Sequence, residues 1–481
     1  MPRLRSPLVI LWLLAGLALP PALAQPAGQP ALPIAGAPAS RPDTPPSGLD
    51  AELFYQLLIA ELQRRHDPGA AYSIILEAAR RTGHPELFRR AMEIALQGRA
   101  PQAALSAVRE WRQRLPADDE ARRTELQLLL GLQRVREAGP VLRDWIRATP
   151  APQRPALIAV IPSLLARASD KAEAVAAAQT ALEPFLREAP TSAAAWAALG
   201  RVHRQAGDDE QALHAARQAI QADPRAAAGA LLAVELLERR PVEAEPLVQR
   251  YLHATRDATD TDPVVAISYA QALAERGRMA EARAVLQHTR TARPDERRRL
   301  LIAEARLLRD QDQPQAAYDV LTQALRDTPD DPDLQYELAM VAERTGRLDE
   351  MERLLRAVIA RKPDDANAYN ALGYALADRG VRLTEAKALI EEALRRAPDD
   401  AYIVDSLGWV EYRLGNWPEA RRLLTQAMQQ RPDAEIAAHL GEVLWMMGER
   451  DEALAVWRQG LALDARNRTL TETLQRLGVQ P

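Results

Sequence analysis

The amino-acid sequence predicts an all-α solenoid in which antiparallel helix hairpins stack one on the next. The first indication is composition: Ala, Leu, Glu and Arg dominate a chain that is 47% hydrophobic and holds only three Phe. The second is a series of prolines spaced by 35, 34, 35 and 34 residues, namely Pro294, Pro329, Pro363, Pro398 and Pro432. A fixed period of this length is the sequence signature of stacked repeats.

The first 24 residues have the pattern of a cleavable secretory signal peptide. Arg3 and Arg5 precede the apolar run LVILWLLAGLAL, and Ala22-Leu23-Ala24 supplies the small residues of a cleavage site. Cleavage there leaves Gln25 first, whereas a lipid anchor would need a cysteine at that position, and the chain has none. We therefore expect a periplasmic protein without a lipid anchor, soluble or peripherally associated with the envelope. The alternative is an uncleaved N-terminal membrane anchor.

Residues 25–48 are dense in Pro, Ala and Gly and have no helical periodicity. Such a segment cannot bury enough apolar surface to offset the entropy that ordering would cost. We interpret it as a disordered linker between the cleavage site and the folded part.

From about Leu49 onward the chain alternates helical runs with short breaks. Residues 49–192 keep helical hairpins with a divergent pattern, residues 193–466 repeat regularly, and residues 467–481 have the length of a C-terminal capping helix. A small residue at the eighth position of a repeat and another at the twentieth let two antiparallel helices cross closely. One hairpin cannot bury its own apolar face, so stacked neighbours are expected to cover it.

The residues that define this framework are glycine, alanine, tryptophan or proline at fixed repeat positions. They are Trp196, Gly200, Ala212, Pro224, Gly373, Pro398, Gly408, Gly415, Trp417, Ala420, Pro432 and Gly441. Glycine in the turn, such as Gly415, permits the backbone conformation in which helices commonly end. Trp417 falls in the turn of its repeat, and we interpret it as a ring that packs between the two helices.

These positions make the chain resemble the tetratricopeptide repeat family. The segment from Trp196 to Pro224 matches the family's signature, as do residues 401–432. The resemblance is strong over residues 193–224 and 263–465. It implies a right-handed superhelix with a concave groove that is lined by the first helix of each hairpin and receives protein partners.

A row of aromatic and polar residues falls on the expected groove positions, which are the second, fifth, ninth and twelfth of each repeat. Trp409 and Tyr412 lie three residues apart on one helix. The same helix face carries Tyr402 and Asp405. Neighbouring repeats place at such positions Tyr336, Met340, Asn367, Asn370, Tyr374 and Trp445. Tyr and Trp beside Asn and Asp are typical of a recognition surface. The alternative is that the C-terminal helix folds back over these rings and makes them core.

No motif in the sequence predicts an enzyme, a cofactor or a metal site. The seven histidines are scattered, and neither a phosphate-binding loop nor a nucleophile elbow occurs. We interpret His439 as a half-buried helix residue. The net charge of −4, with basic clusters set among acids, gives no indication of nucleic-acid binding.

Three segments sharpen the functional expectation. Residues 52–65, 70–96 and 370–420 resemble a proteobacterial group of tetratricopeptide proteins. Similar proteins are outer-membrane lipoproteins that bind and activate a periplasmic carboxyl-terminal processing protease and bring it cell-wall hydrolases as substrates. The resemblance implies an adaptor that binds partner peptides or helices, although this chain lacks the cysteine that would carry a lipid.

The alternative to an adaptor is a protein of another functional class, a structural assembly factor. In that role the repeats would hold together an envelope machine for secretion or polysaccharide export and would present no substrate. Capture of a partner from envelope extract distinguishes the two.

Overall fold

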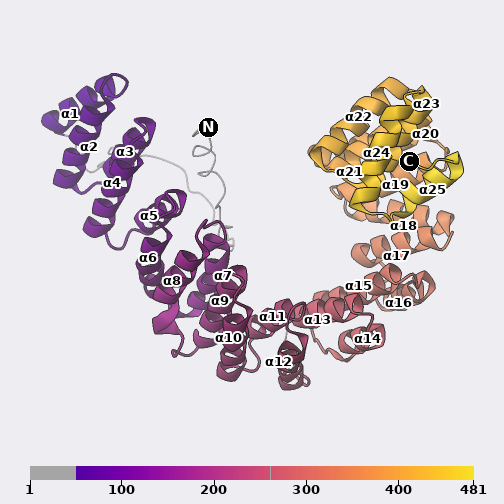
Figure 1. The fold of residues 1–481 in the computed structure, drawn as a ribbon, viewed down its shortest axis with the longest axis horizontal. Helices are drawn as coiled ribbons and strands as arrows, with labels where there is room; N and C mark the ends of the chain where they lie inside the picture. Colours follow the sequence, from indigo (N-terminus) through magenta and orange to yellow (C-terminus); the bar gives the residue numbers. More distant parts are fainter. Residues whose placement is uncertain (1–49, 260–261) are drawn as a thin grey trace, which may run out of the picture. The chain divides into compact units, whose positions relative to one another are not determined.

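The computed structural model describes residues 50–259 and 262–481, and helices are the regular elements of this part of the chain (Figure 1). The all-α class predicted from the sequence is therefore confirmed. The predicted signal peptide, residues 1–24, and the predicted linker, residues 25–48, lie outside the described residues. The chain divides into two compact units, unit 1 ending at Ala254 and unit 2 beginning at Thr255.

Unit 1 holds twelve α-helices and two short 3-10 helices within the described residues. They are α1 (Ala51–Gln63), α2 (Pro68–Thr82), α3 (Pro85–Gln97), α4 (Pro101–Arg114), α5 (Asp119–Gly131), α6 (Val135–Ala148), η2 (Ala151–Gln153), α7 (Arg154–Leu165), α8 (Lys171–Leu182), η3 (Glu183–Phe185), α9 (Ser192–Gln205), α10 (Asp209–Ala222), α11 (Ala227–Leu236) and α12 (Pro241–Ala254).

Unit 2 holds thirteen α-helices within the described residues. They are α13 (Val264–Glu275), α14 (Met279–His288), α15 (Pro294–Asp310), α16 (Pro314–Asp327), α17 (Pro332–Arg344), α18 (Leu348–Arg361), α19 (Ala366–Asp378), α20 (Leu383–Arg396), α21 (Ala401–Arg413), α22 (Trp417–Gln430), α23 (Ala434–Met447), α24 (Arg450–Leu463) and α25 (Arg468–Leu477).

Each odd-numbered helix of unit 2 up to α23 forms a hairpin with the even-numbered helix that follows it. Most successive first helices of these hairpins also contact one another, as α13 does with α15, α19 with α21 and α21 with α23. Neighbouring helices lie closest on the inner side of a curved stack. We therefore name the surface formed by α13, α15, α17, α19, α21 and α23 the inner face.

Aspartates begin several first helices of unit 2. The side chain of Asp331, Asp365, Asp400 or Asp433 accepts a hydrogen bond from a backbone N–H in the first turn of α17, α19, α21 or α23, respectively. These caps satisfy donors that a helix leaves unpaired at its start. The proline that precedes each cap stops the previous helix.

Glycines at the eighth repeat position lie where two helices cross closely. A Cβ on Gly441 would lie 2.2 Å from the indole nitrogen of Trp457, and one on Gly408 would lie 2.7 Å from Cγ of Leu424. Gly200 and Gly373 are equally crowded, with 2.3 Å and 2.6 Å to the nearest side-chain atom. The close approach inferred from the sequence at these positions is present.

The hairpin pattern is irregular in the middle of unit 1. There α6 packs mainly against α8, and α7 packs against α9. The 3-10 helix η2 separates α6 from α7, and Pro162 lies inside α7. A proline inside a helix removes one backbone hydrogen bond, and the changed order of helix pairing is found in the same region where the sequence pattern diverges.

Two tryptophans that we placed in the repeat framework have different environments. Trp196 is half-buried, and its indole N–H donates to the carbonyl of Leu186 at 3.1 Å. Trp417 is 37% exposed, unlike the packed ring that the sequence predicted. It is the first residue of α22, and the buried stripe of that helix begins only at Ala420.

Among the helices of residues 50–259 and 262–481, none combines the length and apolar character needed to cross a membrane.

Candidate partner-binding site

The residues predicted to line a groove lie on four first helices of unit 2, namely α17, α19, α21 and α23. Their exposure differs. Tyr402 and Asn367 are exposed, whereas a second group is half-buried: Tyr336, Met340, Asn370, Tyr374, Tyr412 and Trp445. Asp405 and Trp409 are each only 5% exposed.

Trp409 and Asp405 therefore do not face an open groove, which corrects the sequence-based expectation. The Trp409 ring stacks on the His439 imidazole of α23, with ring centroids 4.4 Å apart and planes 23° apart. Tyr412 packs on the same indole at 5.1 Å. The cover over Trp409 thus comes from the next first helix, because α23 leans against α21, rather than from the C-terminal helix that the alternative invoked.

His439 links three consecutive repeats. Its Nδ1 lies 3.0 Å from both carboxylate oxygens of Asp405 on α21, and its Nε2 lies 3.3 Å from the hydroxyl of Tyr374 on α19. The side chain is 1% exposed. Sequence reasoning missed this arrangement. The available signal was weak, since His439 is at the sixth position of its repeat, one residue past the position that corresponds to Asp405.

The charge of His439 depends on its acidic surroundings. Burial by itself lowers the pKa of His439, but attraction and hydrogen bonding from Asp405, together with Glu435 and Glu442, raise the pKa above its ordinary value. When the ring is protonated both nitrogens donate, one to Asp405 and one to the oxygen of Tyr374. Burial also raises the pKa of Tyr374 well above its usual range.

Carboxylates surround the half-buried Tyr374. Burial raises the pKa of Glu343 on α17, and the neighbouring charges of Asp378 on α19 and Glu435 on α23 raise it further. Burial likewise raises the pKa of Glu435, while His439 partly opposes that change. Carboxyl groups from three first helices therefore share one region of negative potential on the inner face.

The C-terminal helix α25 packs mainly on α23. Leu470 and Leu474 are buried in the cluster formed with α23 and α24. Arg476 donates to Glu442 of α23 at 2.5 Å, and the Tyr412 hydroxyl donates to the same carboxylate at 3.3 Å. Burial and Glu442 together raise the pKa of Tyr412 to about 12. The helix thus fixes the polar end of Tyr412 indirectly, through a shared carboxylate.

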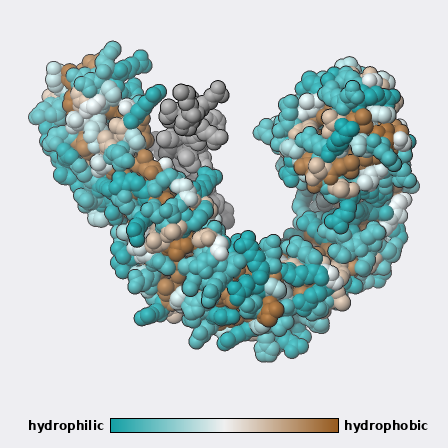
Figure 2. Space-filling model, in the orientation of Figure 1, coloured by the Kyte–Doolittle hydropathy of each residue, from teal (hydrophilic) through white to brown (hydrophobic). Residues whose placement is uncertain are grey.

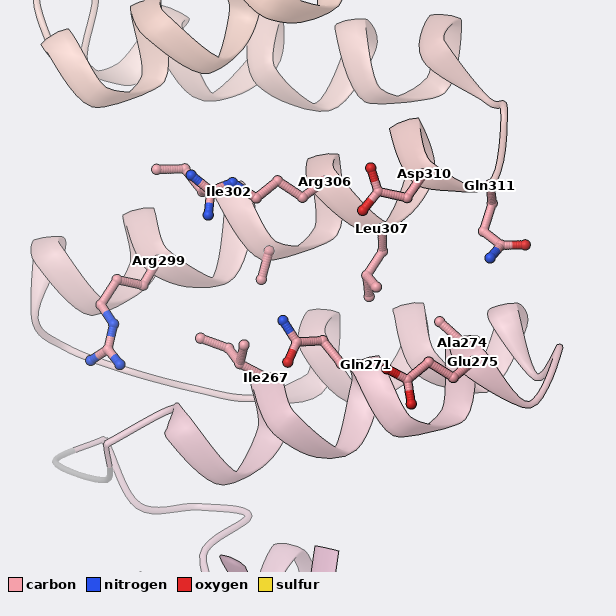
Figure 3. A pocket seen from close by; sticks show the side chains of 11 residues that line it. Ile267, Gln271, Ala274, Glu275, Arg299, Ile302, Arg306, Leu307, Asp310 and Gln311 are labelled. Carbon is pink, nitrogen blue, oxygen red and sulfur yellow. The ribbon is translucent and has the colours of Figure 1, made fainter. Parts of the chain in front are cut away.

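A cleft of about 710 Å³ opens on the inner face between α13 and α15 (Figure 3). Ile267, Gln271 and Glu275 line it from α13. From α15 its lining includes Arg299, Ile302, Arg306 and Asp310. An apolar floor with charged groups around it suits a side chain or short segment of another protein, and the volume is in the range of ligand pockets in proteins.

Sequence reasoning did not single out this cleft, although the repeat pattern contained the signal. Counted back from the turn at Gly277, Ile267 and Gln271 occupy the fifth and ninth positions of their repeat. Ile302 and Arg306 occupy the same positions in the next repeat. The groove rule applied at Trp409 therefore also locates this cleft.

Arg306 and Arg299 are held at the cleft by acidic partners. Arg306 donates to Glu337 of α17 from both Nε, at 3.0 Å, and Nη2. Arg299 donates to Asp262 at 3.3 Å. The hydrogen bond that Arg306 donates to Glu337 is the main cause that raises the pKa of Arg306, so this guanidinium stays charged. In the part of the chain that the structure describes, no group of His, Asp and Glu side chains is arranged to hold a metal ion.

A helical-repeat scaffold is the class of protein that this fold and inner face define. Comparison with family models gives a more specific result, because two tetratricopeptide repeat models match the chain. One matches residues 308–375, and the other matches residues 163–227, 352–401 and 406–468. Over these residues the chain matches the tetratricopeptide repeat, and proteins built from such repeats bind protein partners.

Among curated proteins, the chain is similar to TPR repeat-containing protein PA4667 of Pseudomonas aeruginosa. The two are 38% identical over 170 residues, which is 35% of this chain and 29% of the relative. The matched part therefore spans less than a third of the relative's length.

Solved structures of repeat proteins also match. TTC0263, a thermophilic TPR protein of Thermus thermophilus, is 26% identical, with a TM-score of 0.34 over 37% of this chain and 98% of its own. Yeast Tom70 is 13% identical, with a TM-score of 0.41 over 89% of this chain and 94% of its own.

Proposed function

We propose that this protein is an exported scaffold of the bacterial cell envelope whose inner face in unit 2 binds a basic helix or extended segment of a partner protein. We further propose that it acts as an adaptor, which activates a carboxyl-terminal processing protease and presents cell-wall hydrolases to it. The first part rests on the chemistry of the inner face. The second rests on the resemblance of residues 52–65, 70–96 and 370–420 to such adaptors, and export rests on the pattern of residues 1–24.

The observation that carries the proposal is the combination of half-buried tyrosines with carboxylates on α17, α19 and α23. Tyr336 and Tyr374 offer ring surface, and burial raises the pKa of both phenols, which therefore stay neutral. Glu343 and Glu435 add negative potential beside them. A Lys or Arg side chain gains from both features, through cation–π contact and through relief of the repulsion between carboxylates.

The cleft between α13 and α15 extends the same surface toward the start of unit 2. Its lining includes the half-buried Ile267 and Ile302, which can hold an anchoring side chain of the bound segment, and the exposed Glu275 and Asp310. A partner that places a basic stretch near Tyr374 and an apolar residue in this cleft would use several repeats at once.

The test is capture of partners from bacterial envelope extract with the full-length protein as bait. A double variant, Glu343→Gln with Glu435→Gln, removes two charges and preserves side-chain shape. We expect about tenfold less captured partner, equivalent to about 1.4 kcal/mol, and a smaller deficit at high salt, where charges are screened.

The matched control is Glu385→Gln with Glu419→Gln, which makes the same change in charge on the second helices α20 and α22. Equal loss of capture in both double variants would contradict a specific role for the inner face. The adaptor part has its own readout, since the captured protease, once purified, should cleave a peptide faster when the bait is added. Capture of secretion or polysaccharide-export components instead would favour the assembly-factor alternative.

A further inference from the structure

The first helix of the array, α1, exposes a stripe of large apolar side chains. Phe54, Tyr55, Leu58 and Leu62 are 55%, 64%, 45% and 66% exposed. They are four of the eleven large apolar residues exposed in the described part of the chain. Figure 2 shows apolar surface at this end of unit 1. A concentration of this kind on one helix marks an interaction surface.

The stripe lies on a helix that is apolar on two sides. Leu53 and Ala60 are buried, and α1 packs with them against α2. At 100° per residue, Phe54, Leu58 and Leu62 are within about 80° of one another on another side of the helix. A helix that is apolar on two sides is typical of one that is covered on both.

The opposite end of the array has such a cover. There α25 lays Leu470, 0% exposed, and Leu474, 8% exposed, onto the last hairpin. Stacked repeats need a capping element at each end, because the terminal hairpin otherwise leaves its apolar face in water. Within the described residues, α1 has its stripe uncovered.

We propose that a second copy of this chain covers the stripe, with the two α1 helices packed antiparallel about a two-fold axis beside Leu58. The spacing of the stripe supports this arrangement. Phe54 and Leu62 each lie four residues from Leu58, so an antiparallel neighbour sets Leu58 against its own counterpart and Phe54 against Leu62 of the second copy. A two-fold interface requires a self-complementary surface of this kind.

The charges at the two ends of α1 select the antiparallel arrangement. Asp50 and Glu52 lie at its start, and Glu61, Arg64 and Arg65 lie at its end, where Arg64 pairs with Glu61 at 3.3 Å and Arg65 leaves a net positive charge. Antiparallel packing brings the acidic end of one copy beside the basic end of the other. Parallel packing would place like charges together, which is unfavourable. This inference does not depend on the proposed adaptor role.

A chain without cysteine permits a direct test by disulfide cross-linking. The full-length variant Leu58→Cys should oxidise to a covalent dimer, because the two-fold axis brings its two thiols together. An equimolar mixture of Phe54→Cys and Leu62→Cys proteins should cross-link more than either protein alone. Strongest cross-linking of Phe54→Cys to itself would indicate parallel helices and would overturn the arrangement.

A second measurement uses sedimentation equilibrium of the full-length protein. Leu58→Glu should raise the dissociation constant of the dimer at least about 30-fold, because two carboxylates would then meet in an apolar interface. The matched control is Val242→Glu on α12, where a single valine is 82% exposed, and it should leave the constant unchanged. All variants share residues 1–49, so a difference between them reports on the substituted position. A wild-type protein that stays monomeric at every concentration would overturn the proposal.

Discussion

On the inner face of unit 2, we call the space between two consecutive first helices a step. Two steps are built from the same kind of hairpin but are filled differently. Between α21 and α23, the Trp409 indole stacks on His439, and Asp405 binds the same imidazole. That step is core. Between α13 and α15, side chains at the corresponding repeat positions leave a cleft of about 710 Å³. A partner can insert a side chain between the two helices only at the second step, whereas at the first it can contact only the surface.

The difference lies in a few side chains on a shared framework. At the fifth and ninth positions, the filled step has the buried carboxylate of Asp405 and the indole of Trp409, and both contact the imidazole of His439 on the next first helix. The open step has Ile267, Gln271, Ile302 and Arg306, and Arg306 is drawn toward Glu337 on the next first helix. Small residues and turns therefore fix where the helices lie, while the inward positions decide whether a step becomes core or a binding surface.

The largest expected effect is on the filled step. Trp409→Ala should lower the free energy of unfolding by about 3–5 kcal/mol, because it leaves a cavity beside His439. Chemical denaturation followed by circular dichroism measures this change. Gln271→Ala, at the same repeat position in the open step, should change the free energy of unfolding by no more than about 0.5 kcal/mol.

Trp409→Phe refines the same comparison. It keeps a ring against His439 and removes the indole N–H, which is buried and lacks a hydrogen-bond partner within the described residues. We expect a much smaller loss than for Trp409→Ala. Equal losses for the two variants would mean that the size of the ring does not explain the stability of this step.

The framework itself can be tested at Gly441. A methyl group there would meet the buried Trp457 ring at 2.2 Å, so Gly441→Ala should cost about 1–3 kcal/mol of unfolding free energy. Gly131→Ala is the matched control, because a Cβ there meets no atom within 4 Å. Similar thermal denaturation midpoints for the two variants would contradict a close helix crossing at Gly441.

The pH dependence of stability should reflect the filled step. The pKa of His439 is raised in the folded protein, so its contribution is complete below the ordinary histidine pKa and is lost as pH rises through the folded value. His439→Gln should therefore flatten the decline of the unfolding free energy as pH rises above the ordinary histidine pKa, which we call the alkaline decline.

His203 provides a control of opposite sign. Burial lowers its pKa, with Asp208 opposing in part, so its contribution is present above the ordinary pKa and is lost as pH falls through the folded value. His203→Gln should alter the acidic side of the stability profile and leave the alkaline decline in place. If the free energy of unfolding of His439→Gln declined with rising pH as steeply as that of the wild-type protein, the imidazole of His439 would not be the cause of the decline.

The smallest expected effect on stability belongs to the open step. Ala303 lines the cleft, and Ala303→Trp should fill it while changing the free energy of unfolding by no more than about 0.5 kcal/mol. Capture of the partner should nevertheless fall. Undiminished capture with a normally folded variant would exclude the cleft from the partner-binding surface.

The periodic part of the fold could be predicted from the sequence because its physical requirements recur every repeat. A glycine such as Gly408 is needed wherever two helices cross closely, and a break is needed wherever a helix ends. Glycines and helix breaks therefore recur in the sequence about every 34 residues, even where the residues at other positions vary. The α7 region was harder to predict, since η2 and Pro162 alter the helix pairing locally without a period.

The candidate site was predictable only in part. Repeat position indicates which side chains point inward, and it placed Tyr374 and Trp409 on neighbouring inner helices. Whether an inward ring is exposed depends on its partner one repeat later, and here the pairing of Asp405 with His439 buries Trp409. The exposed stripe on α1 could not be predicted either, because the sequence alone does not show which neighbour, if any, covers an apolar residue.

The bond between Tyr374 and His439 has a consequence for how unit 2 loses its structure. In a simple repeat array each hairpin touches only its immediate neighbours, and melting can begin at one end and proceed hairpin by hairpin. A hydrogen bond that spans 65 residues ties α19 to α23 across the intervening α21. Fraying from the C-terminal end must break this tie before the last hairpin can detach, so loss of that hairpin is coupled to α19 as well as to its immediate neighbour.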